Sequence, residues 1–309
     1  MSTLAAAADF MNGDLHGTDH PFSGVSTDTR TLQEGELFVA LQGPNFDGCD
    51  YVGKARDKGA AGAVVPTLVD EDIPQISVEN SRRALGQLGA AWRQQLSPVV
   101  IGVTGSNGKT TLKELTAACL GKGAPTLATH GNLNNDIGMP LMLTRIEEKH
   151  RFAVIEMGAN HIGEIAYLTA LATPDIVVIT NAGAAHLEGF GSLDGVARGK
   201  GEILCGETRP KVAILNADDR YFDYWSKLVA DTQLITFGID ADADVTARNI
   251  DADAAGSSFD LRLPVGEIDI TLPLAGRHNV RNACAAAAIA VAVGIDIADI
   301  KSALESVKP

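Results

Sequence analysis

The chain has 309 residues, a length that favours two domains over one. Apolar residues make up 45% and charged residues 21%, a globular composition that excludes a disordered or fibrous chain. The formal net charge of −14 repels phosphate backbones and anionic lipid, which argues against nucleic acid and membrane surfaces as partners. Any phosphate-bearing ligand must therefore be held by a local site.

The cysteines and the apolar runs indicate the compartment. Cys49, Cys119, Cys205 and Cys284 are scattered and form no CxxC pair, which is typical of single thiols in a reducing compartment. Residues 1–11 have no basic region, so no signal peptide is expected. The longest apolar run, 283–293, is about half the length that crosses a bilayer. We therefore expect a soluble, cytoplasmic protein without membrane insertion. A monomer is also expected.

Residues 1–97 form the first block of the chain. Short apolar runs predict strands at 36–41, 62–66 and 75–78. The apolar spacing between and after them predicts helices at 49–58 and 79–96. This block is expected to be a small α/β domain.

Residues 98–309 form the second block, which opens with a continuous apolar run at 99–104. Such runs are found in strands buried on both faces, and further runs follow at 152–157, 175–180, 212–215 and 234–237. Helical stretches between most of them predict a mostly parallel sheet with crossover helices. Residues 240–273 alternate with a period of two, which predicts antiparallel strands at one edge, before closing helices at 278–293 and 297–307. The expected fold class is α/β.

A glycine-rich segment, TGSNGKTT, lies between the predicted strand at 99–104 and a helix that begins near Lys109. The N–H groups of such a turn and the positive end of the helix suit a polyphosphate, so the segment predicts a nucleotide site. Lys109 is expected to reach the terminal phosphates and the Thr110 hydroxyl to bind Mg²⁺. The standard phosphate-loop pattern requires glycine where this chain has Val103, so the loop is a shorter variant. The residues expected to hold the nucleotide are Gly105, Ser106, Asn107, Gly108, Lys109, Thr110 and Thr111.

Polar residues follow the other predicted parallel strands, where ligands of open parallel sheets bind. Glu156 is a candidate Mg²⁺ ligand, and His186 is a candidate ligand of a second ion or a general base. Asp218 and Asp219 could instead cap the helix that follows them. Lys200 lies in a predicted helix, and its spacing alone leaves open that it is an ordinary surface lysine.

Long segments of the chain, in order, resemble the Mur ligases, the ATP-dependent amide-forming enzymes of bacterial cell-wall precursor synthesis. The segments are STDTRTLQEGELFVALQGPNFDG (26–48), GVTGSNGKTTLKE (102–114), GNLNNDIGMPLML (131–143), VIEMGANHIGEI (154–165), ITNAGAAHLEGFGSLDGVARGKGEIL (179–204) and GRHNVRNACAA (276–286). Within the family they are most similar to the member that joins D-alanyl-D-alanine to UDP-N-acetylmuramoyl-tripeptide through an acyl phosphate. The resemblance implies a UDP-binding first domain and a P-loop-type, ATP-binding central domain.

The resemblance also implies roles for individual residues. It places Ser26, Asp28 and Arg30 near the UDP end of the substrate, and Asn132, Asn134 and Asn135 near the muramoyl-peptide and the γ-phosphate. Asn279 and Asn282 are implied to contact adenine. Two Mg²⁺ ions and a carbamylated Lys200 are implied at the catalytic centre. Its catalytic residues are Lys109, Glu156, His186 and Lys200, and its metal ligands are Thr110, Glu156, His186 and Lys200.

Family members carry a third, C-terminal domain, which is expected to be absent from this chain. The resemblance therefore implies that these 309 residues alone do not complete amide synthesis. Three alternatives remain open at this point. They are a sister ligase that adds diaminopimelate or lysine, a P-loop kinase or regulatory NTPase, and a non-catalytic module that binds the UDP-substrate.

Overall fold

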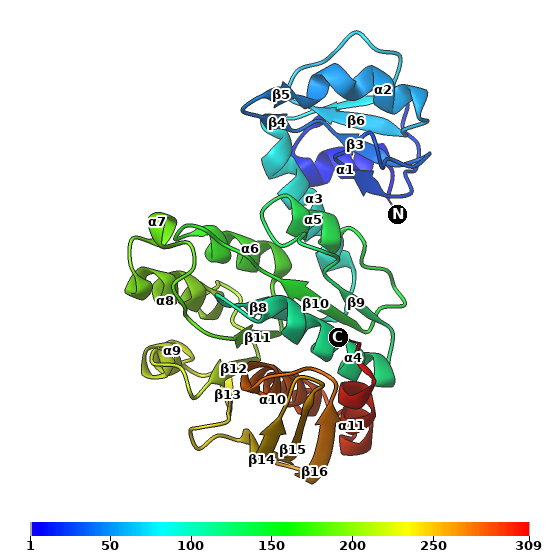
Figure 1. Ribbon diagram of the computed structural model, residues 1–309. Coiled ribbons are helices and arrows are strands. Elements are labelled where there is room, and N and C mark those ends of the chain that lie inside the picture. The colour runs from blue at the N-terminus through cyan, green and yellow to red at the C-terminus, as the bar shows by residue number, and fades with distance from the viewer. Residues whose placement is uncertain (1, 309) are drawn as a thin grey trace. The chain divides into compact units, whose positions relative to one another are not determined.

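The computed structural model describes residues 2–308, which divide into two compact units (Figure 1). Unit 1 comprises the chain up to Leu96 together with Asp136–Ile146. Unit 2 comprises Ser97–Asn135 and the chain from Glu147 onward. The sequence suggested one boundary near residue 97 and did not indicate that residues 136–146 return to unit 1.

Unit 1 is built on a five-stranded sheet with the order β1-β7-β6-β3-β2, in which only β1 runs antiparallel to its neighbour. A separate hairpin is formed by β4 (Gln42–Gly43) and β5 (Phe46–Asp47). The strands of the sheet are β1 (Asp14–His16), β2 (Val25–Ser26), β3 (Leu37–Val39), β6 (Gly62–Val65) and β7 (Gln75–Ser77). The three strands expected from the apolar runs are β3, β6 and β7, and their prediction is confirmed.

The helices of unit 1 are α1 (Leu4–Met11), the 3₁₀ helix η1 (Gly48–Tyr51), α2 (Val52–Asp57), α3 (Ser81–Gln95) and α5 (Gly138–Leu143). The helix predicted at 49–58 therefore begins as a 3₁₀ turn. Helix α1 was not predicted, although Leu4, Ala7, Ala8 and Met11 form a buried face at helical spacing. Helix α5 is buried along its whole length and packs on α3, where Gly89 gives the room that Pro140 needs. Burial of this short apolar helix explains why residues 136–146 belong to unit 1.

Unit 2 contains a nine-stranded sheet with the order β16-β15-β14-β13-β12-β11-β8-β10-β9. Its strands are β8 (Val99–Thr104), β9 (Thr126–Ala128), β10 (Phe152–Glu156), β11 (Ile176–Ile179), β12 (Val212–Asn216), β13 (Gln233–Gly238), β14 (Val245–Ala252), β15 (Ser257–Leu263) and β16 (Gly266–Leu272). Neighbours from β9 to β14 pair in parallel, and β14, β15 and β16 pair antiparallel. The predicted α/β class, the parallel sheet and its antiparallel edge are confirmed.

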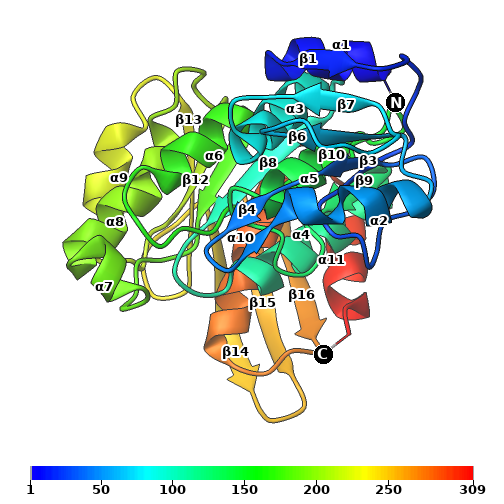
Figure 2. The same cartoon turned by 90° about the horizontal axis from the view of Figure 1, so that it is seen from above.

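Helices α4, α10 and α11 share one apolar core with the strands of unit 2 (Figures 1 and 2). In α10 the run Ala285–Ala288 is fully buried, since small side chains let this helix approach α4 and the sheet closely. The helices of this unit are α4 (Lys109–Gly123), α6 (Glu164–Ala172), α7 (Leu187–Phe190), α8 (Leu193–Gly201), the 3₁₀ helix η2 (Glu202–Leu204), α9 (Phe222–Leu228), α10 (Arg277–Ala292) and α11 (Ile297–Ser306).

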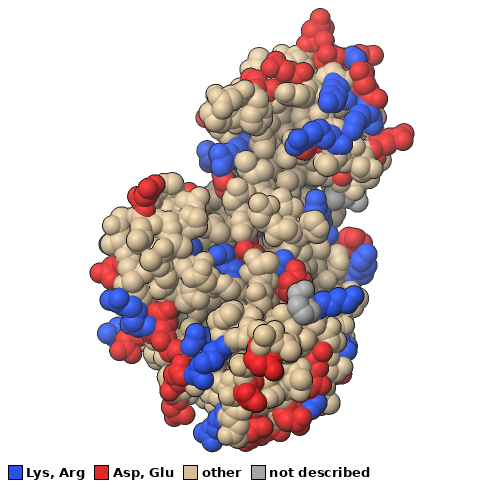
Figure 3. Space-filling view, viewed as in Figure 1, with Lys and Arg blue, Asp and Glu red and all other residues tan. Residues whose placement is uncertain are grey.

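The surface agrees with the acidic composition. On the face shown in Figure 3, acidic side chains are spread over both units, with basic side chains in small groups between them. Among residues 2–308, no helix is both long and apolar enough to span a bilayer.

Candidate functional site

The glycine-rich segment of unit 2 connects β8 to α4, as the sequence predicted. Gly105 has a φ of 143° and Gly108 a φ of 81°, a region that residues with a side chain rarely adopt. A Cβ at Gly105 would also lie 1.9 Å from Thr180 Oγ1. Glycine is therefore required at Gly105 by both the backbone angle and the space.

The end of β11 holds the first half of this loop in place. Ser106 N–H donates to Asn181 O at 3.0 Å, and Asn107 N–H donates to Asn181 Oδ1 at 3.1 Å. Thr180 Oγ1 in turn donates to Asn107 O at 2.7 Å. Because these two N–H groups are engaged, an anion would be met by the N–H groups at the start of α4, which have no partner within the helix. Sequence reasoning did not assign Asn181 a role in fixing the loop.

Lys109 is folded back onto the loop that it follows. Its Nζ donates to Gly105 O at 2.7 Å and approaches Ser106 O at 3.5 Å. Burial lowers the pKa of Lys109, and the nearby Glu156 carboxylate opposes this effect. The amine thus lies among the groups expected to receive phosphate.

Glu156 ends β10 and is 2% exposed, so its carboxylate depends on the partners around it. Thr110 Oγ1 donates to Glu156 Oε2 at 3.1 Å, and Asn134 Nδ2 donates to Glu156 Oε1 at 2.7 Å. The structure thus brings together Thr110, Glu156 and Asn134, all of which were expected at the site.

These groups fit a Mg²⁺ ion bound together with a nucleotide. The ion takes oxygen ligands and is commonly held by one or two carboxylates plus substrate phosphates. In residues 2–308, no three His, Cys, Asp or Glu side chains are grouped closely enough to hold a metal by themselves. Glu156 and the Thr110 hydroxyl would therefore supply the protein's share of the ligands, and the phosphates the remainder.

His186 lies on the surface before α7, with a left-handed φ of 54°. Its role as a second metal ligand or base stays a prediction. Asn132 and Asn135, also expected near the γ-phosphate, are exposed beside the better-placed Asn134.

Lys200 lies on α8 and is 2% exposed, so it is not the surface lysine that its spacing left open. Its Nζ lies 5.3 Å from the centre of the Phe190 ring. None of the carboxylates in the described part of the chain is within ion-pair distance of it. Burial and, to a smaller extent, the positive charge of Lys109 lower the pKa of Lys200 to about 8, although the carboxylates of Glu164 and Glu202 oppose this shift. The unusual feature is a desolvated amine close to the phosphate-loop lysine.

Asp218 and Asp219 do not cap α9, whose N-cap is Tyr221 and has no side-chain cap hydrogen bond. Asp218 accepts N–H groups from Ile239, Asp240 and Ala241 and forms an ion pair with Arg281 at 2.8 Å. These hydrogen bonds hold the pKa of Asp218 below its usual value, although burial opposes them. Asp219 accepts the N–H groups of Ala182 and Tyr221. Both carboxylates therefore tie loops of unit 2 together.

The residues expected to contact adenine lie at the start of α10. Asn282 is largely buried, and a Cβ at Gly108 would lie 2.8 Å from Asn282 Oδ1. Asn282 Nδ2 donates to Asn279 Oδ1 at 3.4 Å. The first turns of α10 thus adjoin the phosphate loop, while the contact with adenine stays a prediction.

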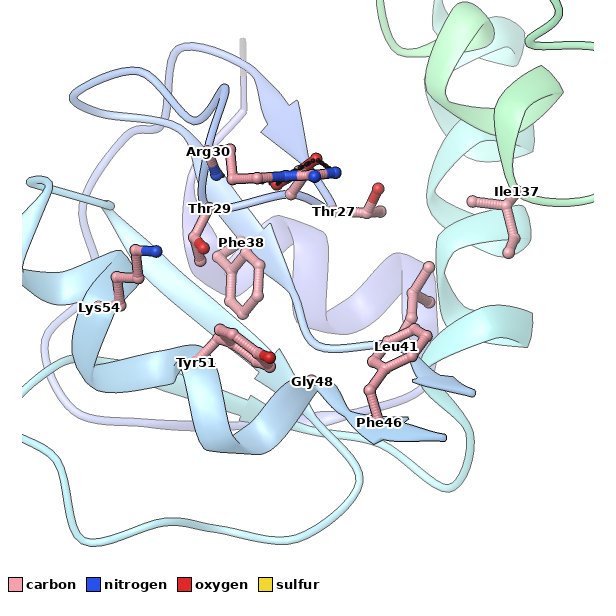
Figure 4. A pocket seen from close by; sticks show the side chains of 11 residues that line it. Thr27, Thr29, Arg30, Phe38, Leu41, Phe46, Gly48, Tyr51, Lys54 and Ile137 are labelled. Carbon is pink, nitrogen blue, oxygen red and sulfur yellow. Dashed lines mark hydrogen bonds and ion pairs between the residues drawn. The ribbon is translucent and has the colours of Figure 1, made fainter. Parts of the chain in front are cut away.

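Unit 1 contains a cavity of about 480 Å³ (Figure 4). Asp28 and Arg30, two of the residues expected near UDP, line it and form an ion pair at 2.6 Å. The side-chain and backbone hydrogen bonds that Arg30 donates to the Asp28 carboxylate lower the pKa of Asp28 to about 2. Ser26 does not line the cavity but exchanges hydrogen bonds with the backbone of Asp28. The full lining is Thr27, Asp28, Thr29, Arg30, Phe38, Leu41, Phe46, Gly48, Tyr51, Lys54 and Ile137.

Sequence reasoning predicted Arg30 but missed the aromatic residues and Lys54 of this cavity. Phe46 is 55% and Tyr51 43% exposed, and Lys54 reaches the cavity from α2 (Figure 4). The Phe46 ring covers Gly43, where a Cβ would lie 2.3 Å from a ring carbon. Phe46 lies within the segment 26–48 that carried the family resemblance, but only the folded hairpin shows that it borders a cavity.

The mostly parallel sheet and the glycine-rich loop between β8 and α4 place this chain in the class of α/β proteins with a phosphate-binding loop. Residues 103–290 match the family profile "Mur ligase middle domain", and residues 21–93 match "Mur ligase family, catalytic domain". The chain therefore belongs to the Mur ligase family.

Individual relatives agree with this assignment. The chain is 45% identical to UDP-N-acetylmuramoyl-tripeptide–D-alanyl-D-alanine ligase of Escherichia coli, over 99% of this chain and 68% of that protein. A crystal structure of MurF from Acinetobacter baumannii has a TM-score of 0.91 at 38% identity, over 99% of this chain and 68% of that one. MurF ligase from Thermotoga maritima in complex with ADP has a TM-score of 0.80 at 28% identity, over 93% of this chain and 66% of that one.

The first prediction concerns the phosphate loop. Lys109→Ala should weaken ATP binding about 10- to 100-fold, because it removes a charged donor from the phosphates. The fold should persist, since the described bonds of this amine go only to loop carbonyls. Calorimetry measures the affinity, and Lys122→Ala, an exposed lysine on the same helix, is the matched control. Equal affinity of Lys109→Ala and the unaltered chain would contradict the assignment.

The second prediction concerns the buried Lys200. Its pKa of about 8 is below the ~10.4 of an unfolded chain, so burial costs stability below pH 8. From pH 8 to about 10.4 only the unfolded chain keeps the proton, so stability rises with pH. In metal-free, CO₂-free buffer, Lys200→Met should raise the free energy of unfolding by up to about 3 kcal/mol at pH 7. The gain should shrink towards pH 10 in denaturant titrations, and a gain independent of pH would refute the shifted pKa.

Proposed function

We propose that this protein catalyses the ATP-dependent joining of D-alanyl-D-alanine to UDP-N-acetylmuramoyl-tripeptide in peptidoglycan precursor synthesis. The observation that carries the proposal is the phosphate loop whose Thr110 hydroxyl meets the buried Glu156 carboxylate, in a chain 45% identical to the E. coli ligase of that name. The chain spans 68% of that relative's length, so the activity of the whole protein belongs to the proposal. A cytoplasmic location and a monomeric state are part of it.

The reaction has two steps. The terminal carboxylate of the tripeptide attacks the γ-phosphorus of ATP, which gives an acyl phosphate and ADP. The amine of D-alanyl-D-alanine then attacks the acyl carbon, an amide forms, and phosphate leaves. A carboxylate must approach a highly charged nucleotide, so neutralisation and positioning are the main tasks of the protein. Lys109 and the N–H groups at the start of α4 bind the phosphates in this proposal.

Mg²⁺, when bound, neutralises phosphate oxygens and the attacking carboxylate. Glu156 and Thr110 would hold one ion, and Asn134 orients the Glu156 carboxylate through its 2.7 Å hydrogen bond. A second ion, with His186 and Lys200 near it, belongs to the proposal, as does adenine binding by Asn279 and Asn282.

Carbamylation of Lys200 is also proposed. The amine is 2% exposed, and burial together with the positive charge of Lys109 lowers its pKa to about 8, which makes the neutral amine more accessible near neutral pH. A carbamate forms from the neutral amine and CO₂ with loss of one proton, and it turns the cation into an anion with two oxygens. Such an anion suits a place beside bound cations, whereas a bare ammonium does not.

The cavity of unit 1 is proposed to take the UDP part of the substrate. The exposed rings of Phe46 and Tyr51 offer stacking surfaces for a base, and Lys54 and Arg30 offer positive charge for a diphosphate. A kinase or regulatory NTPase has no use for such a unit, and residues 21–93 match the Mur ligase family. A non-catalytic UDP-binding module would not need the phosphate loop and Glu156.

The third prediction tests the acceptor. ADP formation from ATP should be stimulated by UDP-N-acetylmuramoyl-tripeptide and much less by the corresponding dipeptide, because only the tripeptide places its terminal carboxylate at the γ-phosphate. A coupled ADP assay on the chain measures this, with Lys109→Ala as the inactive control. Preference for the dipeptide would instead assign the chain to a sister ligase that adds diaminopimelate or lysine.

The fourth prediction tests the cavity. Lys54→Ala and Phe46→Ala should each weaken binding of the UDP-linked tripeptide about 5- to 20-fold, through loss of a charged contact or a stacking surface. ATP affinity should not change. Calorimetry without ATP measures binding, and Arg83→Ala, an exposed residue of unit 1 outside this cavity, is the control. Unchanged affinity in both cavity variants would show that UDP binds elsewhere.

A further inference from the structure

Lys113 is a buried charged residue that the proposed reaction does not use. It lies on α4, about one helical turn after Lys109 and Thr110, and is 2% exposed. An ammonium group in such a place is costly unless it is paired and hydrogen-bonded. Its Nζ donates to Thr129 O at 2.7 Å and forms an ion pair with the exposed Glu114 at 2.9 Å. The hydrogen bond reaches the residue that directly follows β9.

That hydrogen bond occupies the acceptor with which the β9–β10 ladder would continue. The strands pair in parallel from Phe152 and Thr126 to Val154 and Ala128, and Thr129 N–H still donates to Val154 O at 2.9 Å. In a parallel ladder the next bond would run from Glu156 N–H to Thr129 O. Glu156 N–H instead donates to Thr129 Oγ1 at 2.9 Å, while Thr129 O accepts the hydrogen bond from Lys113 Nζ.

Beyond Thr129 the chain forms a loop whose Asn134 side chain contacts the Glu156 carboxylate. Asn134 N–H donates to Asn132 O at 2.7 Å, and Gly158 N–H donates to Asn134 O at 2.8 Å. These bonds hold the Asn134 side chain against the Glu156 carboxylate. Thr129 is thus the point where the strand ends and the asparagine-containing loop begins.

We propose that Lys113 is a positioning residue for the Mg²⁺ site. By holding Thr129 O, it ends the β9 ladder, directs Glu156 N–H to the Thr129 hydroxyl, and starts the loop that brings Asn134 to the Glu156 carboxylate. Lys113 therefore fixes the metal-binding carboxylate at both its backbone and its side chain without touching substrate. This inference rests on the proposed function, because it concerns the same ion.

The experiment compares nucleotide affinity with and without Mg²⁺ by calorimetry, using ATP as the probe. Removal of a residue that orients a metal ligand typically costs about 10- to 100-fold in metal affinity. Lys113→Met keeps the length of the side chain and removes the donor. It should bind ATP in EDTA as the unaltered chain does, but require about 10- to 100-fold more Mg²⁺ for the metal-dependent gain. Lys122→Met, on the exposed side of the same helix, is the matched control.

A second pair of variants keeps the test decisive if Lys113→Met does not fold. Thr129→Val removes the hydroxyl that accepts Glu156 N–H and preserves the shape of the side chain, and Thr129→Ser retains the hydroxyl. The valine variant should show the shifted Mg²⁺ requirement and the serine variant should not.

The outcomes separate this inference from the proposed function. An unaltered chain whose ATP affinity does not depend on Mg²⁺ would defeat the proposed function. If that dependence is present, an unchanged Mg²⁺ requirement in folded Lys113→Met overturns the role of Lys113 alone. If Lys113→Met lost as much ATP affinity in EDTA as in Mg²⁺, the role of Lys113 would also be overturned, because a general structural defect would explain the loss. If only the Thr129 variants fold, equal Mg²⁺ requirements for Thr129→Val and Thr129→Ser would overturn the inference.

Discussion

The parallel register of β8, β10 and β11 is the constraint on which the rest of the site depends. Glu156 pairs with Val103, and Ile179 pairs with Thr104, so these strands end at one edge of the sheet beside Gly105. The Glu156 carboxylate, the phosphate loop and Asn181, which accepts hydrogen bonds from that loop, meet there although they are far apart in sequence. A slip of one residue in β10 would turn Glu156 to the opposite face, because side chains alternate along a strand.

This arrangement buries several charged side chains, which is unfavourable for the free energy of folding unless each charge is compensated. Glu156, Lys113 and Lys200 are each 2% exposed, and they differ in how the charge is accommodated. Glu156 accepts hydrogen bonds from Thr110 and Asn134, and Lys113 donates to Thr129 O. Lys200 lies over the Phe190 ring, and burial lowers its pKa to about 8. Of these three buried residues, Lys200 is the one for which a chemical modification is proposed.

The division into units links the two proposed binding functions along the chain. Asn134 reaches the Glu156 carboxylate in unit 2, and at Asp136 the chain enters unit 1, where α5 is buried and Ile137 lines the cavity. One short segment therefore contributes to the metal site and to the proposed UDP cavity.

The sequence by itself determined the α/β class, the positions of the main strands along the chain, the phosphate loop and the family, because apolar runs, glycine spacing and long motifs are local signals. It also singled out Glu156, Lys200 and Asn134, but left open whether Lys200 was a surface residue. It did not show α1, the return of 136–146 to unit 1, or the roles of Phe46, Lys54, Thr180 and Lys113. Those depend on which groups are brought together from distant positions, and on which become buried. Burial and strand register are properties of the packed chain, so only the tertiary structure decided that Lys200 is desolvated and that Lys113 ends the ladder beside Glu156.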